Sequence, residues 1–327
     1  MLFIPNDSYD PYFNLACEEY VLKNLAGVEP CFLLWQNKPT IVVGRFQNTQ
    51  AEINFEFVQK RKVNVVRRNT GGGAVYHDLG NLNFTFIQQS EQRKLDFRRF
   101  TLPIVKALNA MGVPAELSGR NDLTIKGKKF SGNSQYHYKG KIMHHGTLLF
   151  NSNLDDVAEA LLVSPEKFES KGVKSVRGRV TNISEYLNLE FTIAQFKAIL
   201  LEYLFAGREI KKYNLNAEDL KKIGNLRQEK YLTWEWNYGH SPGFDFRQKK
   251  RFSCGEIEVG LVIKAGKIKE CKFYGDFFSN EDLTILEKGL VGLKYQEGEI
   301  EAFFQKINPE KYFERVEWKE LSRLFFP

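Results

Sequence analysis

The run Arg67-Arg68-Asn69-Thr70-Gly71-Gly72-Gly73-Ala74-Val75-Tyr76-His77-Asp78 carries more information on fold and chemistry than any other stretch of this chain. Glycine adopts positive φ without a steric penalty and lets backbone N–H groups come close to a ligand. Amides that point the same way form a concave anion site, and neighbouring arginines add forked donors. Since β-branched residues precede and follow the glycines, we expect a bend between strands that binds a carboxylate or phosphate. The alternative is a glycine-rich hairpin without a ligand.

A second informative segment, residues 119–134, indicates two strands joined by a tight turn. Leu123 and Ile125 alternate with polar neighbours, and Lys126-Gly127-Lys128 supplies the turn. Residues 141–150 form another strand-like stretch, which contains His144 and His145. Consecutive residues of a strand point to opposite faces, so these two histidines are not expected to bind one metal ion together.

Taken together, these segments resemble the lipoate–protein ligases, which are relatives of the biotin protein ligases. The resemblance rests on the arginine and triple-glycine run with its trailing Tyr-His-Asp, the Gly-Arg-Asn-Asp-Leu stretch at 119–123, the Lys-x-Ser-Gly pattern at 129–132 and the His-His-Gly-Thr-Leu-Leu run at 144–149. Residues 174–182 fit the same family. The resemblance extends, in order, over most of residues 1–240.

The pattern of elements favours an α+β fold. Strands cluster with scattered helices, and the family resemblance implies a biotin-protein-ligase-like catalytic domain with a mixed or antiparallel sheet at residues 1–244. Ile257, Val259, Leu261 and Ile263 alternate strictly after a charged junction at 247–251, which indicates a half-buried strand. Residues 245–327 are therefore expected to form the small α+β accessory domain that many bacterial lipoate ligases carry.

The family's reaction implies two steps in one pocket. The carboxylate of lipoate attacks the α-phosphate of ATP and gives lipoyl-AMP, with Mg²⁺ as the accompanying ion. A lysine amine of an acceptor protein then attacks the mixed anhydride and releases AMP. Negative charge builds up where two anions already repel, so fixed positive charge is what the chemistry needs most.

The resemblance assigns roles to individual residues. Lys129 matches the catalytic lysine that contacts both the acyl carboxylate and the α-phosphate; the alternative is a solvated hairpin lysine. Arg68 corresponds to the arginine that binds nucleotide phosphate. Asp122 is a candidate for orienting Lys129 or for holding Mg²⁺ through water, although an ion pair with Arg120 or Lys126 would explain it equally. The segment expected to line the ATP site consists of Gly73, Ala74, Val75 and Tyr76.

Five further residues are expected near lipoate or lipoyl-AMP. Gly71 and Gly72 would let the acyl chain and its carboxylate pass close to the backbone. Arg45 and His77 are expected to border the acyl pocket, and a structural role is an equal alternative for His77. His145, beside a glycine, is expected to face the site.

The charge distribution supports anionic ligands. The net charge is +7, and residues 245–327 contain 15 basic and 15 acidic residues, so the excess lies entirely before that point. Such an excess suits ATP and an acidic protein partner. Nucleic acid is the competing interpretation, but the sequence has no helix-turn-helix, zinc-finger or aromatic–basic RNA-binding signature.

The four cysteines argue against related chemistries. Cys17, Cys31, Cys254 and Cys271 contain no C-x-x-C pair, which excludes the usual zinc spacing and favours buried reduced thiols. Octanoyl- and lipoyltransferases of the same fold use a cysteine nucleophile, but the motif-bearing segment here has none. The biotin ligase loop is replaced by the glycine run. A non-catalytic binding protein is disfavoured because the catalytic lysine is present.

Partners and location follow as expectations. The acceptors implied are lipoyl domains of 2-oxoacid dehydrogenase E2 subunits, the glycine-cleavage H protein, or both. The first six residues are too short an apolar run for a signal peptide, and no run of eighteen apolar residues occurs. We therefore expect a soluble, cytoplasmic protein without membrane contact, and a monomer. An elongated apolar pocket would accept either lipoate or octanoate.

Overall fold

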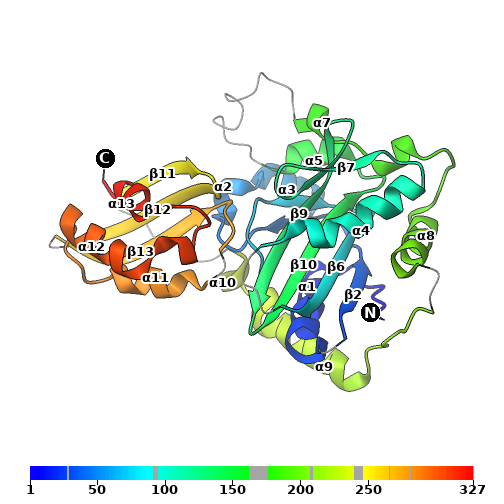
Figure 1. Cartoon of the computed structure of the whole chain (residues 1–327), viewed down its shortest axis with the longest axis horizontal. Helices are drawn as coiled ribbons and strands as arrows, with labels where there is room; N and C mark the ends of the chain where they lie inside the picture. The colour runs from blue at the N-terminus through cyan, green and yellow to red at the C-terminus, as the bar shows by residue number, and fades with distance from the viewer. Residues whose placement is uncertain are drawn as a thin grey trace.

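The structure is a computed structural model that describes residues 1–27, 29–90, 95–161, 176–206, 209–238, 246–264, 266–279 and 281–326. A larger N-terminal unit, built on a mixed sheet, packs against a smaller C-terminal unit (Figure 1). This arrangement confirms the α+β class with a small α+β accessory domain. The expected boundary between residues 244 and 245 lies outside the described residues and stays a prediction.

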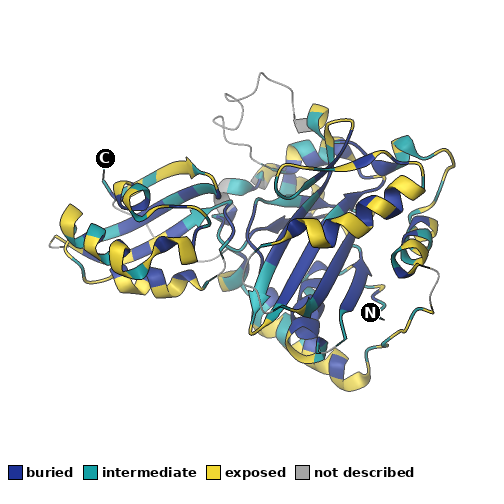
Figure 2. Ribbon diagram, viewed as in Figure 1, coloured by how far each residue is buried: buried dark blue, intermediate teal, exposed yellow. Residues whose placement is uncertain are grey.

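The larger unit is organised by a seven-stranded sheet in the order β1-β2-β6-β10-β9-β8-β7. The β1–β2 pair is parallel and the other pairs are antiparallel. The strands are β1 (Leu2–Phe3), β2 (Cys31–Trp35), β6 (Asn81–Gln89), β7 (Ala115–Ser118), β8 (Asp122–Ile125), β9 (Lys128–Tyr138) and β10 (Lys141–Leu149). Most residues of the central strands are buried (Figure 2), because helices cover both faces of the sheet.

Helix α1 (Pro11–Tyr20) begins at a capping aspartate followed by a proline. Asp10 accepts a hydrogen bond from the N–H of Tyr12 at 3.0 Å, and Pro11 occupies the first turn, where its missing N–H costs nothing. The helix continues as a π-helical turn, η1 (Val21–Leu25), and ends before Gly27. It packs with α9 (Ala217–Leu226) on one face of the sheet, around a core that includes Leu33 and Ile87.

The opposite face of the sheet is covered by α4 (Phe97–Ala110) and α8 (Ile193–Phe205). Phe196 and Leu200 of α8 are fully buried, as their helical spacing predicts, whereas Ile193 and Leu204 are only partly buried. The other helices of this unit are α2 (Thr49–Glu52), α3 (Phe55–Arg61), α5 (Leu154–Ala160), α7 (Val176–Arg179), η2 (Ile183–Tyr186), η3 (Arg227–Tyr231) and α10 (Trp234–Asn237).

A second, three-stranded sheet carries the glycine run. Its order is β4 (Asn64–Arg67), β3 (Thr40–Val43), β5 (Val75–His77), with β3 parallel to β4 and antiparallel to β5. The glycines thus join two strands that β3 separates, and they do not form a hairpin. A connection across an intervening strand leaves the glycine backbone outside regular pairing, which frees it to line a cavity.

The lysine-bearing hairpin predicted from the sequence is confirmed. β8 and β9 pair antiparallel through a turn in which Lys126 and Gly127 both have positive φ. The register shifts so that Leu123 pairs with Ser131 and Thr124 with Lys129, which leaves Phe130 as a β-bulge. A bulge bends the strand and redirects the neighbouring side chains.

The C-terminal unit is an antiparallel sheet, β11-β12-β13, covered by helices. Its elements are β11 (Phe246–Phe252), β12 (Gly255–Lys264), β13 (Lys267–Gly275), α11 (Leu283–Leu290), α12 (Glu297–Ile307), η4 (Pro309–Lys311) and α13 (Trp318–Arg323). Ile257, Val259 and Leu261 are fully buried, as their alternation predicts. The prediction of a charged junction at 247–251 is wrong, since this run is the edge strand β11. Charged side chains are common on edge strands because they discourage pairing with other chains.

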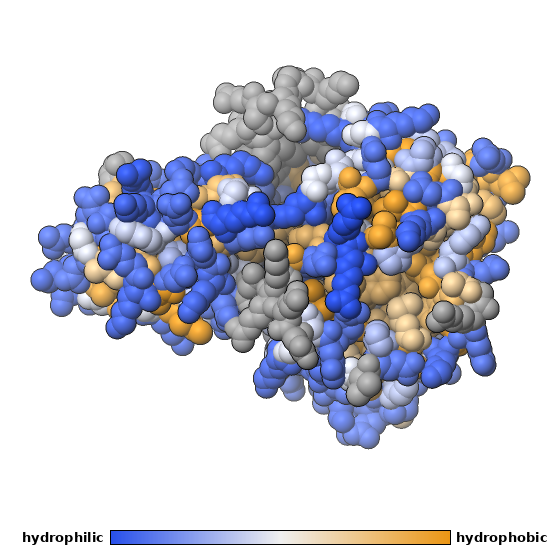
Figure 3. Space-filling model, in the orientation of Figure 1, coloured by the Kyte–Doolittle hydropathy of each residue, from blue (hydrophilic) through white to orange (hydrophobic). Residues whose placement is uncertain are grey.

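Across the described ranges, no helix is long and apolar enough to cross a membrane. The face of the molecule in Figure 3 is largely hydrophilic over the C-terminal unit, and apolar side chains gather mainly over the N-terminal unit.

Candidate functional site

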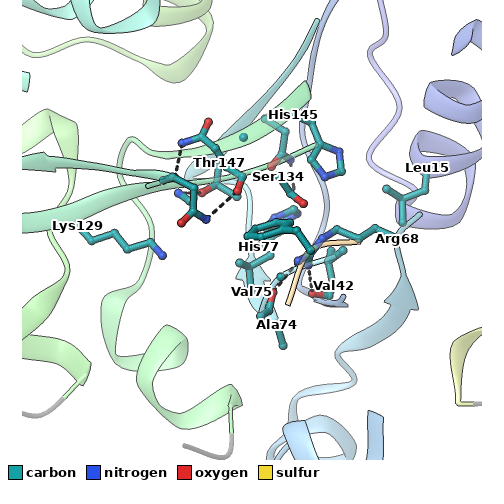
Figure 4. Close-up of a pocket in the computed structure, with 18 of the residues that line it drawn as sticks. Leu15, Val42, Arg68, Ala74, Val75, His77, Lys129, Ser134, His145 and Thr147 are labelled. Carbon is teal, nitrogen blue, oxygen red and sulfur yellow. Dashed lines mark hydrogen bonds between the residues drawn. The ribbon is translucent and has the colours of Figure 1, made fainter. Parts of the chain in front are cut away.

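The sequence-predicted residues meet at a cavity between the two sheets of the N-terminal unit (Figure 4). The small sheet contributes Val42, Val75 and His77, and the large sheet contributes residues of β2, β6, β9 and β10. The full lining is Leu15, Trp35, Val42, Arg68, Gly72, Gly73, Ala74, Val75, His77, Asn83, Asn121, Lys129, Gly132, Asn133, Ser134, His145, Gly146, Thr147 and Phe278. The wall is mostly apolar, with cationic groups at two places, as an amphipathic acid would require.

Lys129 stands at one end of this cavity. Its Nζ lies 2.8 Å from a carboxylate oxygen of Asp122, and both side chains remain about two-fifths exposed, at 41% and 38%. A β-carbon at Gly132 would lie 3.2 Å from the Lys129 ammonium, so glycine leaves the ammonium room to lie over β9. The backbone is fixed as well, because Thr181 N–H donates to the carbonyl of Lys129 at 3.0 Å.

The guanidinium of Arg68 holds the glycine run in shape. Its Nε donates to Thr70 Oγ1 at 2.9 Å, and Nη1 donates to the carbonyl of Val42 at 3.1 Å. Nη2 donates to the carbonyls of Gly71 and Gly73 at 2.7 and 2.8 Å. These bonds use four of the five donors of the group. Burial lowers the pKa of Arg68 to about 10, so the charge persists at neutral pH beside the cavity.

Thr70 connects the glycine run to a buried acid. His145 Nε2 lies 2.8 Å from Thr70 Oγ1, and His145 Nδ1 lies 3.0 Å from Glu18 Oε1. Glu18 is 2% exposed and also accepts a hydrogen bond from Thr85 Oγ1. Trp35 Nε1 donates in turn to Thr85 Oγ1 at 2.9 Å. The result is a continuous polar chain from β2 through α1 and β10 to the glycine segment.

The next residue of α1 holds the other side of the same segment. Glu19 Oε2 accepts from Asn69 Nδ2 at 2.8 Å and from Tyr231 Oη at 2.6 Å. Lys230 Nζ lies 2.7 Å from both Glu19 Oε2 and Asn69 Oδ1. Burial alone would raise the pKa of Glu19, but the charge of Lys230 and hydrogen bonds from Lys23, Lys230 and Tyr231 outweigh it and hold that pKa at about 2.

His77 lies deeper in the cavity, in front of Trp35, with ring centroids 6.1 Å apart. Its Nδ1 is 3.1 Å from Asn37 Nδ2 and 3.5 Å from Asn83 Nδ2. Within the part of the chain that the structure describes, its buried Nε2 has no hydrogen-bond partner. Burial, with smaller effects of Arg68 and His145, lowers the pKa of His77 to about 3, so the ring is neutral.

The C-terminal unit contacts the glycine run directly. Gly72 N–H donates to the carbonyl of Phe277 at 3.2 Å, and a β-carbon at Gly71 would lie 2.5 Å from that oxygen. Gly72 has φ +86°, and a β-carbon there would lie 3.1 Å from the ring of Phe278. Phe277 also stacks on Phe46, with centroids 5.0 Å apart. Glycine is required here both by the positive φ and by the close packing.

A larger basic cavity of about 1040 Å³ opens next to the first one. Both units line it, and its cations are Arg120, Lys129, Arg179, Lys249, Lys250 and Arg251. Its acidic residues are Asp122, Glu256 and Asp276. The lining therefore carries a net positive charge. Lys129, Gly72, Gly73 and Phe278 belong to both cavities, so they mark the place where the two meet.

Most predicted site residues thus come together. Arg68, Gly72, Gly73, Ala74, Val75, His77, Lys129 and His145 line the first cavity. Gly71 and Arg45 instead line a separate cavity on the far side of the glycine segment, where the Arg45 guanidinium lies over the rings of Phe46 and Tyr136. The side chain of Tyr76 packs into the core against Phe57. The functional roles of all these residues stay predictions.

The two neighbouring histidines face opposite ways, as predicted. His144 is fully buried on the other face of β10, with its Nδ1 2.9 Å from Gln135 Nε2 and its ring stacked on Phe100. Among the described residues no group of three or more His, Cys, Asp or Glu side chains could hold a metal ion. Asp122 supplies one carboxylate, which pairs with Lys129. Its predicted part in Mg²⁺ binding stays untested.

Sequence reasoning missed Glu18, Thr70 and Phe278. Glu18 and Glu19 interrupt an otherwise apolar helical run, and such an acidic pair was the available signal for buried carboxylates. Thr70 lies inside the run Arg67–Asp78, and its place beside the glycines was the available signal. Phe278 follows a strand in a loop of the other unit, and nothing local indicates where that loop docks.

Comparison with known proteins identifies the family of this chain. The family model described as the lipoyl protein ligase A/B catalytic domain matches residues 10–205, and that of the bacterial lipoate protein ligase C-terminus matches residues 241–325. The chain belongs to the lipoate–protein ligase family. The predicted family resemblance is thereby confirmed.

Individual relatives cover nearly the whole chain. Lipoate–protein ligase 1 of Staphylococcus aureus is 45% identical over 326 residues, which is 99% of each chain. The crystal structure of P. falciparum LipL1 in complex with lipoate has a TM-score of 0.77 and 28% identity, and the match covers 94% of each chain. A bipartite lipoate protein ligase from Thermoplasma acidophilum, studied with its E2 lipoyl domain, has a TM-score of 0.65 and 27% identity over 73% of this chain and 96% of its own.

Proposed function

We infer that this chain is an ATP-dependent lipoate–protein ligase that activates lipoate to lipoyl-AMP and transfers the lipoyl group to a lysine of an acceptor protein. One observation carries this function. The ammonium of Lys129 stands where an apolar cavity meets a basic one. An acyl chain in the first cavity and a triphosphate in the second would bring a carboxylate and an α-phosphate together at this ammonium.

The first step forms a bond between a carboxylate oxygen of lipoate and the α-phosphorus of ATP. The bond from that phosphorus to pyrophosphate breaks, and pyrophosphate leaves into the basic cavity. Lys129 is a compact cation with three donors, so it offsets repulsion between the two anions and stabilises the charge that develops on the phosphoryl oxygens. Asp122, 2.8 Å away, fixes the position of the ammonium.

The second step forms an amide. An uncharged acceptor lysine amine attacks the acyl carbon of lipoyl-AMP, the acyl–oxygen bond breaks, and AMP leaves with both electrons of that bond. The excess proton of the new amide goes to solvent. The backbone of Gly72 and Gly73, which line both cavities, would lie beside the adenylate phosphate, and Arg68 would hold this backbone in place through the carbonyls of Gly71 and Gly73.

Mg²⁺ would lower the charge of the triphosphate when bound. Such ions retain several waters and are held by one or two carboxylates together with substrate phosphates. Asp122, at the edge of the basic cavity, is the residue that fits this role. It would share its carboxylate between the ion and Lys129.

A transferase with a cysteine nucleophile is not supported. All four cysteines are buried free thiols. Burial raises the pKa of Cys17 to about 12 and that of Cys31 to about 11, and it also raises the pKa of the other two. None belongs to the described lining of the first cavity. A nucleophilic thiolate requires the opposite environment.

For the acceptor we propose lipoyl domains of E2 subunits, H protein, or both. The structure of the Thermoplasma relative and its E2 lipoyl domain is consistent with this class. We further propose that residues 1–244 form the catalytic domain and residues 245–327 the accessory domain, and that the protein acts in the cytoplasm as a monomer.

Lipoate-dependent exchange of radioactive pyrophosphate into ATP tests the first step by itself. We expect exchange with lipoate and MgATP and no exchange when either lipoate or Mg²⁺ is left out. Purified acceptor domains then test the second step by a mass increase on one lysine. Transfer between acceptor proteins without ATP would instead support the transferase.

A further inference from the structure

Nε2 of His77, which has no hydrogen-bond partner among the described residues, can be assigned a chemical role. Asn37 Oδ1 accepts from Asn14 Nδ2 at 2.9 Å, and Asn14 Nδ2 in turn faces backbone carbonyls of Ser8 and Gln36. Those carbonyls can only accept, so they fix the amide orientation of Asn14 and then that of Asn37. The amide nitrogen of Asn37 therefore faces His77.

A second asparagine presents its nitrogen to the same ring atom. Asn83 Oδ1 accepts from Asn81 Nδ2 at 2.9 Å, and Asn83 Nδ2 lies 3.5 Å from His77 Nδ1. Because the anchored amide of Asn37 donates at 3.1 Å, Nδ1 is the unprotonated acceptor. A neutral imidazole carries one proton, so that proton is on Nε2. His77 thus presents a buried N–H donor that has no acceptor within the described residues.

The sheet register places this donor relative to Lys129. Gly132, over which the Lys129 ammonium lies, donates through its N–H to Thr147 Oγ1 on β10 at 3.1 Å. Thr147 pairs with Asn83 on β6, and Asn83 contacts His77. Two strand spacings of about 4.8 Å separate β9 from β6, so Gly132 below the ammonium and Asn83 beside the imidazole are about 10 Å apart. In the view of Figure 4, His77 lies between Lys129 and Arg68.

This distance matches an acyl chain with a ring at its far end. The carboxyl group and the nearer dithiolane sulfur of lipoate are six bonds apart, and an extended chain of carbon–carbon bonds of about 1.5 Å spans about 8 Å over that length. A carboxylate at Lys129 would therefore bring the dithiolane to the region of His77. The lining of the cavity includes the apolar Trp35, Leu15 and Val42, and the polar neighbours of His77 there are Arg68, Asn83 and His145.

We propose that Nε2–H of His77 donates a hydrogen bond to a dithiolane sulfur of lipoate, and that this bond makes the enzyme prefer lipoate to octanoate. The proposal rests on the proposed function. Sulfur is a weak acceptor, but a buried donor without any partner destabilises the protein, so even a weak acceptor is favourable here. Octanoate has only methylene and methyl groups at this depth and leaves the donor unpaired. Sites that hold such a donor reject analogues that lack the acceptor.

Substrate selectivity of variants tests this role. The measurement is kcat/KM for lipoate and for octanoate in pyrophosphate exchange. In His77→Phe the ratio of the two values should fall about fivefold, because one modest hydrogen bond is lost. His77→Gln keeps an acceptor for Asn37 and a donor for the cavity, so it should retain more of the ratio than His77→Phe. Val42→Ala, in the same wall, should lower both values by a similar factor.

The intact protein gives a second test, which does not depend on the folding of a variant. In ¹⁵N-labelled protein, His77 should show a slowly exchanging Hε2 proton that shifts downfield with saturating lipoate and shifts less with octanoate. Identical shifts with the two acids, or the proton on Nδ1, would overturn the proposal, as would an unchanged selectivity ratio in His77→Phe. Absence of lipoate-dependent exchange in the unmodified enzyme would instead count against the proposed function.

Discussion

Nδ1 of His145 lies 3.0 Å from the carboxylate of Glu18, 127 residues away in the chain. The other ring nitrogen reaches Thr70, so helix α1 supports the glycine segment through an imidazole. A buried carboxylate that accepts from His145 and Thr85 fixes the ring, and the ring fixes the threonine hydroxyl. Preorganised backbone at the site of charge development needs this kind of support.

Glu18→Ala should therefore weaken both stability and activation. Removing the carboxylate leaves the donors of His145 and Thr85 buried without their acceptor, which we expect to cost about 2–4 kcal/mol of the free energy of unfolding. Urea denaturation measures the stability, and lipoate-dependent exchange measures activity at a temperature where both proteins are folded. Glu29→Ala, on the surface, is the control.

Coupling within this polar chain can be measured separately. Thr70→Val should lower activation by itself, and it should have little further effect in the Glu18→Ala background, because both substitutions break the same connection. Additive losses in a double-mutant cycle would show that Glu18 acts on folding alone.

Lys129→Ala should abolish lipoyl-AMP formation and leave the fold intact. The side chain is 41% exposed and its ion pair with Asp122 is shared with solvent, so the melting temperature should change little. Loss of one preorganised charge costs on the order of a hundredfold or more in rate. Lys129→Arg should also fail, since a longer planar group does not replace an ammonium between two anions. Lys128→Ala is the matched control, and a fully active Lys129→Ala protein would refute the mechanism.

The position of Lys129 could be predicted because its hairpin is specified locally. Lys126 and Gly127 form the turn, and the alternation of Leu123 and Ile125 sets the strand. Glu18 could not be assigned a partner, since its contacts join strands and helices that are distant in sequence. The docking of Phe277 and Phe278 likewise depends on tertiary packing. The sequence predicts a junction where the edge strand β11 lies, because charged residues are also typical of linkers.

Gly72→Val should impair ligand binding and the docking of the C-terminal unit together. The residue has φ +86°, which a β-branched side chain resists, and the added atoms would meet the ring of Phe278 and the guanidinium of Arg68. Calorimetry should show weaker binding of lipoate and of ATP. Arg68→Ala should mainly raise the ATP concentration needed, and unchanged binding in both variants would contradict the assignment of this segment.

Stability should fall in acid through Glu19. Its pKa is about 2 in the folded protein, whereas a free glutamate titrates near 4.5, so the unfolded state binds more protons between these values. The contribution of Glu19 is therefore complete above about pH 4.5 and is lost as pH falls toward 2, by roughly 3 kcal/mol. The difference in unfolding free energy between the unmodified protein and Glu19→Gln should shrink over that window. A constant difference from pH 6 to pH 2.5 would contradict this assignment.

Removal of the C-terminal unit should separate the two half-reactions. Phe278 lines the cavity beside Lys129 and Gly72, and Phe277 contacts the glycine segment, so residues 1–244 alone lack one wall of the site. Activation requires exclusion of water from a hydrolysable anhydride, whereas transfer requires room for a bulky acceptor. We therefore expect the truncated protein to lose most lipoate activation and to keep transfer from supplied lipoyl-AMP.

Phe278→Ala provides the same test in the full-length chain. It removes the ring that covers Gly72 and leaves the other contacts of the C-terminal unit, such as the stacking of Phe277 on Phe46. Pyrophosphate exchange should fall while transfer from lipoyl-AMP changes little. Equal loss of both activities, together with a lower melting temperature, would mean that the C-terminal unit only stabilises the first. Full activation by residues 1–244 would exclude any part for that unit in closing the site.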